Sequence, residues 1–378
     1  MKIKFPKSIV ILLISASLIV CHHRSVLPES EVSQPESNSA ALALQVGPDH
    51  KPFLNETPFA KRPFKPYIGE EWIGNAISYG CYRKGQAPGV KTPTEAEILE
   101  DLNILSPHWN LIRVYGADEA AERVLKVIHE NQLPFRLLLG IWLENETKRP
   151  ERRAENLEQV NKGIALANQY PTEVIAINVG NESQVNWSWH RMDMDVLIQY
   201  IRAVRQFTNQ PVTTSDDYNF WNKPESKAVA DEVDFIALHA YALWNGQLLD
   251  HAMTWTDSIY RDIQSRHSDL DIALTETGWA TTYNPTKMGP GEQGTLMKGE
   301  VGIKAQEKFI TEFWDWAETG KITTFLFEAF DEPWKGGGDQ SGPDEVEKHW
   351  GIFYEDRSPK QSFINYLAER EKHQEHPM

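Results

Sequence analysis

The stretch VIAINVGNE, residues 174–182, is an apolar run that ends in an amide and a carboxylate. The stretch DIALTETGW, residues 271–279, repeats this arrangement, with Glu276 directly after the apolar run. Such runs are expected of parallel strands buried on both faces. Two further strand-like runs lie between them, so alternating strands and helices make them the fourth and seventh strands of one sheet. In a closed eight-stranded barrel, their carboxyl ends face each other across the mouth.

The rest of the chain continues the same alternation. An open, doubly wound sheet is the alternative, but it would need a glycine-rich dinucleotide loop after an early strand, and the sequence has none. Eight strands alternating with helices over about 300 residues is the usual size of a (β/α)8 barrel. We therefore predict one (β/α)8 barrel, with strands over residues 72–79, 110–115, 135–141, 173–179, 211–215, 233–240, 270–276 and 322–328.

Patterns of helical period fill the intervals between these runs. A capping box at residues 92–95, with proline in the first helical position, predicts the start of the first helix. Apolar stripes on one face predict the others. The predicted helices cover residues 120–131, 156–169, 193–207, 226–231, 252–266, 301–318 and 360–372.

The composition limits the classes of partner. The chain has 378 residues, 40% of them hydrophobic, and a formal net charge of -16. A nucleic-acid-binding protein needs a basic face for the phosphates, so we expect no nucleic-acid partner. The same charge disfavours an anionic polysaccharide as a ligand.

The N-terminus resembles a bacterial export signal. Three lysines precede an apolar run, residues 8–20, that is too short to span a bilayer. Cys21 follows at once, as in the lipobox of bacterial lipoproteins, although Val20 stands where a small residue is usual. We predict a signal peptide over residues 1–21, with a lipid on Cys21 as the only link to a membrane. Plain secretion is the alternative. The protein would then be exported to the cell envelope or secreted.

A polar segment follows this signal. Residues 22–66 are rich in Ser, Pro, Glu and Asn and show no sustained period, so we predict a disordered tether. The barrel is then expected over residues 67–378.

Polar side chains occur at the predicted carboxyl end of every strand, where (β/α)8 proteins carry their sites. Each has a structural interpretation too: a strand-end glutamate can be a solvated loop carboxylate, Arg113 a counter-ion, and His239 a core histidine. Their shared position favours a site. The candidates are Tyr79, Arg113, Tyr115, Asn181, Glu182, Tyr218, His239, Tyr241 and Glu276, with Glu332, Trp334 and Lys335 after the last strand.

Tryptophans gather at the same predicted end. The chain has 13, and seven of them follow strands three to eight. They can pack loops onto the barrel, or they can form a cleft in which sugar rings stack on indoles. The seven are Trp142, Trp187, Trp189, Trp221, Trp244, Trp279 and Trp334.

Two chemistries fit these residues. Glu182 and Glu276 would supply the proton donor and the nucleophile that glycoside hydrolysis requires. His239 with strand-end carboxylates could instead hold a divalent ion, but the sequence has no His-Glu-x-x-His motif and no His-x-His on the first strand. We expect no metal and no cofactor.

Six stretches of these residues carry a family resemblance. The chain resembles family 17 of the glycoside hydrolases, the β-1,3-glucanase family, and specifically its bacterial branch. The resemblance covers about residues 70–360. The matching stretches are AISYG (76–80), IRVYG (112–116), VGNE (179–182), TETGWA (275–280), FEAFDE (327–332) and EKHWG (347–351).

The resemblance implies a retaining enzyme that acts on β-1,3-glucan, with Glu182 as acid/base and Glu276 as nucleophile. Glu332, Lys335 and Glu347 match a trio of charged residues beside the family's site. Trp279 and Trp334 stand next to Glu276 and Glu332 in the sequence, so we expect them nearest the cleaved bond. Asn181 is placed to bond the sugar 2-hydroxyl. A transglycosylase on the same site and a non-catalytic glucan-binding protein of the envelope are the alternatives.

Overall fold

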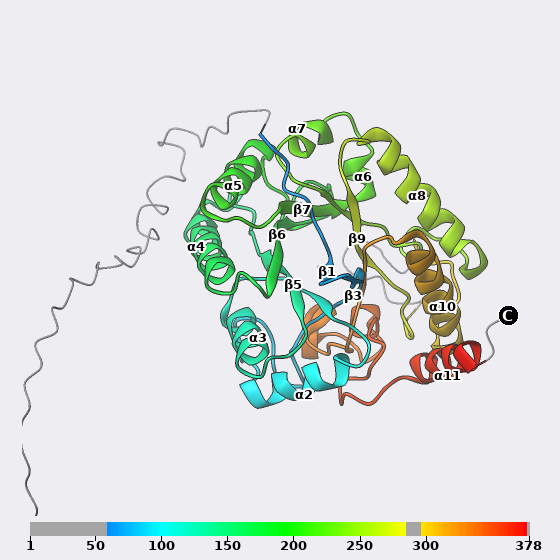
Figure 1. The fold of residues 1–378 in the computed structure, drawn as a ribbon. Coiled ribbons are helices and arrows are strands. Elements are labelled where there is room, and N and C mark those ends of the chain that lie inside the picture. The colour runs from blue at the N-terminus through cyan, green and yellow to red at the C-terminus, as the bar shows by residue number, and fades with distance from the viewer. Residues whose placement is uncertain (1–58, 285–295, 376–378) are drawn as a thin grey trace, which may run out of the picture. The chain divides into compact units, whose positions relative to one another are not determined.

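The computed structural model describes residues 59–284 and 296–375. Eight parallel strands close into a barrel in the order β10-β3-β4-β5-β6-β7-β8-β9, as predicted (Figure 1). Every strand begins and ends within three residues of its predicted bounds. They are β3 (Asn75–Ser78), β4 (Leu111–Val114), β5 (Arg136–Ile141), β6 (Val174–Asn181), β7 (Val212–Asp217), β8 (Ile236–His239), β9 (Ile272–Thr277) and β10 (Thr324–Leu326).

Helices surround the barrel, where their apolar stripes cover the outer faces of the strands (Figure 1). They are α2 (Glu95–Leu105), α3 (Glu119–Glu130), α4 (Arg153–Gln169), α5 (Met194–Phe207), α6 (Tyr218–Trp221), α7 (Ser226–Ala230), α8 (Ala252–Arg266), α10 (Ile303–Gly320) and α11 (Gln361–Glu375). Short 3-10 turns span Pro150–Arg152, Leu249–His251, Lys335–Gln340 and Val346–Lys348. None of the helices in the described ranges is long and apolar enough to cross a bilayer.

The predicted capping box was wrong by two residues. Helix α2 begins after Thr94, whose side chain accepts from the backbone N–H of Glu97 at 3.2 Å, while Glu97 Oε2 accepts from the backbone N–H of Thr94 at 2.8 Å. The sequence contains two overlapping capping-box patterns, one from Thr92 to Glu95 and one from Thr94 to Glu97, and each predicts a different start of the helix. The structure selects the one that pairs Thr94 with Glu97, since this arrangement satisfies two free N–H groups at the helix start.

The inside of the barrel is a separate apolar core. Side chains of alternate strand positions fill it, among them Ala76, Leu138, Ala176, Ala237 and Phe325. Phe64 closes this core by stacking on Phe235, with ring centroids 4.3 Å apart.

Phe64 lies within the predicted tether, so the predicted boundary at residue 66 is wrong. Lys61 Nζ donates to the carbonyl oxygens of Ala230 and Val233 at 3.0 and 2.6 Å, and the Arg62 guanidinium donates to Gln210 O at 2.9 Å. These polar contacts hold residues 59–66 on the barrel. Residues 1–58 lie outside the described part of the chain.

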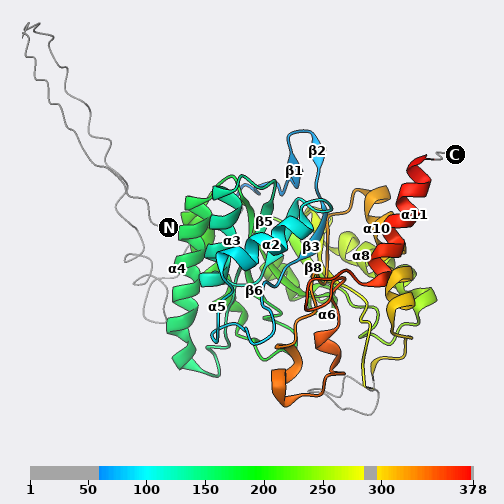
Figure 2. The ribbon, with the colours of Figure 1, turned by 90° about the horizontal axis from the view of Figure 1, so that it is seen from below.

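A small hairpin precedes the first barrel strand and was not predicted. Strands β1 (Tyr67–Ile68) and β2 (Glu71–Trp72) pair antiparallel around Gly69, whose φ of +58° suits glycine. Trp72 therefore belongs to this hairpin and not to the first barrel strand. Figure 2 shows the hairpin at one end of the barrel, and the 3-10 turns after β10 at the other end. The candidate site lies at this second end.

Candidate active site

Glu182 is presented by an irregular end of β6. The register between β6 and β7 shifts between Asn178 and Asn181, and Gly180 adopts a φ of +78°. Glu182 itself has a φ of +48°, and its N–H donates to Ser215 O at 2.9 Å. A positive φ at a non-glycine residue is strained and is concentrated at functional sites. The kink places the carboxyl group of Glu182 in a half-exposed position, as a residue that exchanges protons with a ligand requires.

Glu276 is buried at the end of β9 and held by two donors. Arg113 Nη1 lies 2.7 Å from Glu276 Oε1, and the Tyr241 hydroxyl donates to Glu276 Oε2 at 2.8 Å. Burial alone would raise the pKa of Glu276. The opposing effects of His239 and Arg113, with the Tyr241 hydrogen bond, leave this pKa below its usual value. Glu276 is therefore an anion at neutral pH, as a carboxylate nucleophile must be.

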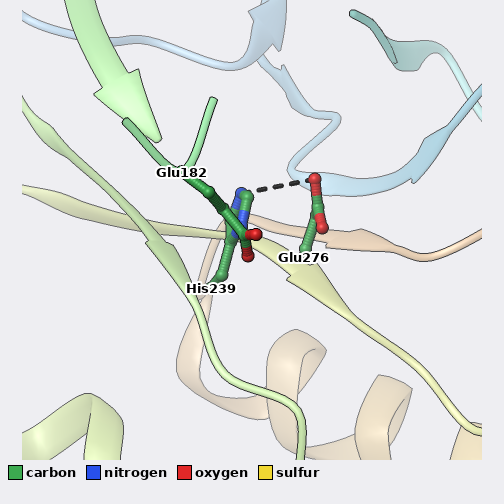
Figure 3. A group of neighbouring side chains, drawn as sticks. All are labelled: Glu182, His239 and Glu276. Atoms are coloured by element: carbon green, nitrogen blue, oxygen red, sulfur yellow. Dashed lines mark hydrogen bonds and ion pairs between the residues drawn. The ribbon is translucent and has the colours of Figure 1, made fainter. Parts of the chain in front are cut away.

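His239 lies between the two glutamates (Figure 3). Its Nδ1 is 3.2 Å from Glu182 Oε1, and its Nε2 is 3.4 Å from Glu276 Oε1. Arg113 Nη1 lies 3.2 Å from the same Nε2. Arginine can only donate, so the Arg113 contact assigns Nε2 as the acceptor and Nδ1 as the nitrogen that donates to Glu182. The buried ring thus orients Glu182 directly, and Arg113, which contacts the same ring, donates to Glu276.

Within the described residues, Glu182, His239 and Glu276 form the one group whose donor atoms are close enough to share a metal ion, all within 4.8 Å of one another. The contacts of Arg113 speak against that use. Its guanidinium already neutralises Glu276 and faces His239 Nε2, and a divalent ion there would meet a fixed positive charge. The donor set fits an orienting network better than a metal site.

Arg113 is fully buried and joins the network to Asn181, whose Oδ1 accepts from Nη2 at 2.6 Å. The Arg113 guanidinium also lies over the Tyr115 ring, 4.5 Å from its centroid. Arg113 and His239 are thus placed to orient the reacting groups and not to touch a sugar, because neither side chain reaches the surface. Asn181 stays half-exposed and accessible to a ligand.

A second charged group follows β10. Lys335 Nζ lies 2.6 Å from Glu328 Oε2 and 2.7 Å from Glu332 Oε2, and Trp334 Nε1 donates to Glu332 Oε1 at 2.9 Å. One ammonium thus faces two buried carboxyl groups. Burial and the Glu332 carboxylate raise the pKa of Glu328 well above its usual value, despite Lys335. Glu332 has a lowered pKa, because Lys335 and hydrogen bonds overcome its burial.

One ammonium group, on Lys335, faces the carboxyl groups of Glu328 and Glu332, and the pKa of Glu328 is the one that is raised. We therefore predict that Glu328 is the neutral acid of this pair. Glu328→Gln preserves a neutral group of the same shape, so we expect less than about 1 kcal/mol of destabilisation and near-parental turnover. Glu328→Ala leaves Lys335 with one partner and should cost about 3 kcal/mol. Urea unfolding and turnover at neutral pH measure both. Equal losses in the two variants would show that Glu328 has to be ionised.

Glu347 lies in the 3-10 turn Val346–Lys348 and adds a third carboxyl group to the surroundings of Lys335. A β-carbon placed on Gly336 would lie only 3.2 Å from Cβ of Glu347, so the glycine-rich insertion packs directly against it. Burial, opposed by Lys335, raises the pKa of Glu347 to about 7. The charges of Glu345, Glu182 and Glu276 also raise this pKa.

Three residues that were predicted to bind the ligand have their polar atoms bound to other parts of the protein. The Tyr79 hydroxyl donates to Asp101 Oδ2 of α2 at 3.1 Å and is turned into a buried ion-pair network. Trp279 is 1% exposed, and its Nε1 donates to Glu300 O, so it offers no open ring face. The Tyr218 hydroxyl is taken by Asn245 Oδ1 at 2.7 Å. These side chains have structural contacts that explain them without a ligand.

Sequence reasoning left Glu328 out of the site. It stands at the end of the last apolar run, as Glu276 does in its own run, so the same strand-end criterion could have selected it. Its role depends on Lys335, which lies seven residues later on an irregular turn. No spacing rule predicts that contact.

Retaining glycosidases hold their two carboxyl groups about 5–5.5 Å apart, whereas inverting enzymes separate them by about 6.5–9.5 Å. Here the facing oxygens of Glu182 and Glu276 lie within 4.8 Å, at the carboxyl ends of barrel strands. The fold and the site therefore define the class of retaining (β/α)8 glycosidases. Residues 76–351 match the BtgE/BtgC glycoside hydrolase domain, and the chain belongs to that family.

Several known proteins are similar to this chain. A glucan 1,3-beta-glucosidase of Arthroderma benhamiae is 27% identical over 76% of this chain and 92% of its own length. A putative glucan endo-1,3-beta-glucosidase, btgC, of Aspergillus niger is 29% identical over 71% of this chain. The match covers only 40% of that longer protein.

Two solved structures show the same fold. An endo-laminarinase from Formosa Hel1_33_131 has a TM-score of 0.66 and 23% identity, over 79% of this chain and 88% of its own. A Rhizomucor miehei beta-1,3-glucanosyltransferase, an active-site mutant in complex with laminaritriose, has a TM-score of 0.58 and 22% identity. The match covers 76% of this chain and 95% of that one.

Proposed function

We propose that this protein hydrolyses β-1,3-glucan with retention of configuration, and that it belongs to the bacterial branch of glycoside hydrolase family 17. The separation within 4.8 Å between the facing oxygens of Glu182 and Glu276 carries the proposal. The names of the similar fungal proteins, all glucan 1,3-beta- or endo-1,3-beta-glucosidases, support the substrate.

In the first step, the Glu276 carboxylate attacks the anomeric carbon while Glu182 gives its proton to the departing glycosidic oxygen. The C–O bond breaks, and a glycosyl ester forms on Glu276. In the second step, Glu182 takes a proton from water, and the water oxygen displaces Glu276 from the anomeric carbon. His239 and Arg113 hold the two carboxyl groups in place throughout both steps.

A product time course on laminarin and laminari-oligosaccharides tests this function. We expect shorter glucose oligomers or glucose. Turnover of cellulose, xylan or an anionic glycan without turnover of laminarin would contradict it, and binding without turnover would favour a non-catalytic protein. Insensitivity to chelators would accompany a metal-free site.

Transfer to a sugar is the second candidate activity. If a sugar hydroxyl replaces water in the second step, the same residues form a new glycosidic bond. The glucanosyltransferase of similar fold supports this alternative. Longer oligosaccharides in the time course would identify it.

The Trp334 ring is half-exposed beside Glu332 and is placed to stack on a sugar. Trp334→Ala should lower kcat/KM on laminarin about two- to tenfold while leaving thermal stability nearly unchanged. Trp334→Phe keeps a ring without its N–H and is the matched control. A large fall in Tm in the alanine variant would show that the ring is needed for packing instead.

We further propose export with a lipid on Cys21. The basic start and the short apolar run support this proposal, and both lie outside the described residues. Mass spectrometry of the membrane fraction should find diacylglycerol on Cys21. A soluble, unmodified mature protein with another N-terminus would reject the anchor and favour secretion.

A further inference from the structure

Two tryptophans on the loop after Glu182 are unusually exposed. Trp187 is 58% exposed and Trp189 79% exposed, and the other tryptophans in the described ranges are buried or half-buried. Tryptophan is enriched at binding interfaces, because its large ring offers an apolar face together with a polar N–H. We propose that these two rings bind the glucan chain on the leaving-group side of the scissile bond, which is also the place of an acceptor sugar. The proposal rests on the proposed function.

The loop is built to present these rings at a fixed place. Its base closes where the Met192 N–H donates to Ser183 O at 3.0 Å. The Gln184 N–H donates to Asp216 Oδ2 at 2.7 Å, and Val185 is buried. The loop is therefore rooted in the residue that follows the catalytic acid.

A second contact ties the loop to the segment after β5. His190 packs edge-on against Trp142, with centroids 4.5 Å apart. Trp142 Nε1 donates to Glu144 Oε1 at 3.3 Å, and His190 Nδ1 lies 3.7 Å from Glu144 Oε2. Burial lowers the pKa of His190, and the charges of Glu144 and Glu182 oppose that shift. His190 is thus close enough to Glu182 to respond to its charge. Trp142 and His190 therefore fix the loop that carries the exposed rings to the segment after β5.

The strand order gives the direction. In the closed barrel, β6 is four strands away from β10, so the loop after β6 lies across the mouth from Lys335 and Trp334. The charge of Lys335 contributes to the lowered pKa of Glu276, whose carboxylate receives the glycosyl group. Glu182 gives its proton to the leaving oxygen, so the chain beyond that oxygen extends toward the side of Glu182 and its loop.

The double variant Trp187→Ala/Trp189→Ala tests the proposal. Tyr67→Ala is the control, because Tyr67 is a 46% exposed aromatic residue on the hairpin at the other end of the barrel. Three readouts are compared: kcat/KM on laminari-oligosaccharides, kcat/KM on a nitrophenyl β-laminaribioside, and the ratio of transfer to hydrolysis as laminaribiose is added.

Each ring should contribute about two- to tenfold to kcat/KM on the oligosaccharides, so we expect the double variant to lose about four- to a hundredfold. Turnover of the nitrophenyl substrate should stay within about twofold, because it has no sugar on the leaving-group side, and the transfer ratio should fall. Equal losses on both substrates, or no loss on either, would overturn the proposal. A parent protein that cleaves neither substrate would instead overturn the proposed function, and this inference with it.

Discussion

Glu276→Ala should lose almost all activity, on the order of 10⁴- to 10⁶-fold in kcat, because the covalent step has no other nucleophile. Azide fits the space that the side chain leaves and attacks from the same face. It should restore turnover of a nitrophenyl glycoside and give the α-glycosyl azide. The product is identified by proton NMR.

Glu276→Gln is the matched control, since its amide oxygen can still accept from Arg113 and its NH2 can donate to the Tyr241 oxygen, while the side chain fills the space that azide needs. It should be equally inactive and should not be rescued. Loss of the fold is tested by thermal unfolding, where both variants must still show a cooperative transition. A Glu276→Ala variant that keeps normal glucan turnover would remove this residue from the reaction.

Glu182→Ala should lose about 10²- to 10⁴-fold on laminarin, the usual contribution of a general acid. A nitrophenolate leaving group needs no proton, so formation of the glycosyl ester from such a substrate should be nearly unchanged. The second step lacks its base, and azide should replace water there and give the β-glycosyl azide. The two readouts are the kcat ratio between the substrates and the configuration of the azide product.

The configurations of the two azides separate the roles. If Glu182→Ala gives the α product and Glu276→Ala gives the β product, the assignments are reversed. His239→Ala is a useful third variant, because His239 contacts both carboxyl groups and its loss should lower activity on both kinds of substrate.

The strands and the two glutamates could be predicted because both depend on local sequence. A short apolar run has few other interpretations in an alternating chain, and barrel geometry brings the ends of distant runs together. Asn181 and Glu182 follow directly from that rule, and so does Glu276.

Directions of individual side chains could not be predicted, because they depend on distant partners. Tyr79 turns to Asp101, which Arg357 also binds from 256 residues away. Trp279 is covered by a loop that brings Glu300 onto its N–H. A strand-end position shows where a residue lies, and only the packing around it shows which way it points.

The attachment of residues 59–66 was missed for a related reason. Their polar composition resembles a tether, yet Lys61 donates to carbonyl oxygens about 170 residues later in the chain. Hydrophobic periodicity along the sequence cannot predict a contact between one side chain and the backbone of a distant turn. The stacking of Phe64 on Phe235 is equally long-range.

Proton NMR of freshly cleaved laminaritetraose tests the central claim most directly. Direct attack by Glu276, followed by attack of water, inverts the anomeric carbon twice, so the new reducing end should appear first as the β anomer and equilibrate later to the mixture. First appearance of the α anomer would show a single displacement. It would contradict a reaction through the Glu182 and Glu276 pair that the structure places within 4.8 Å.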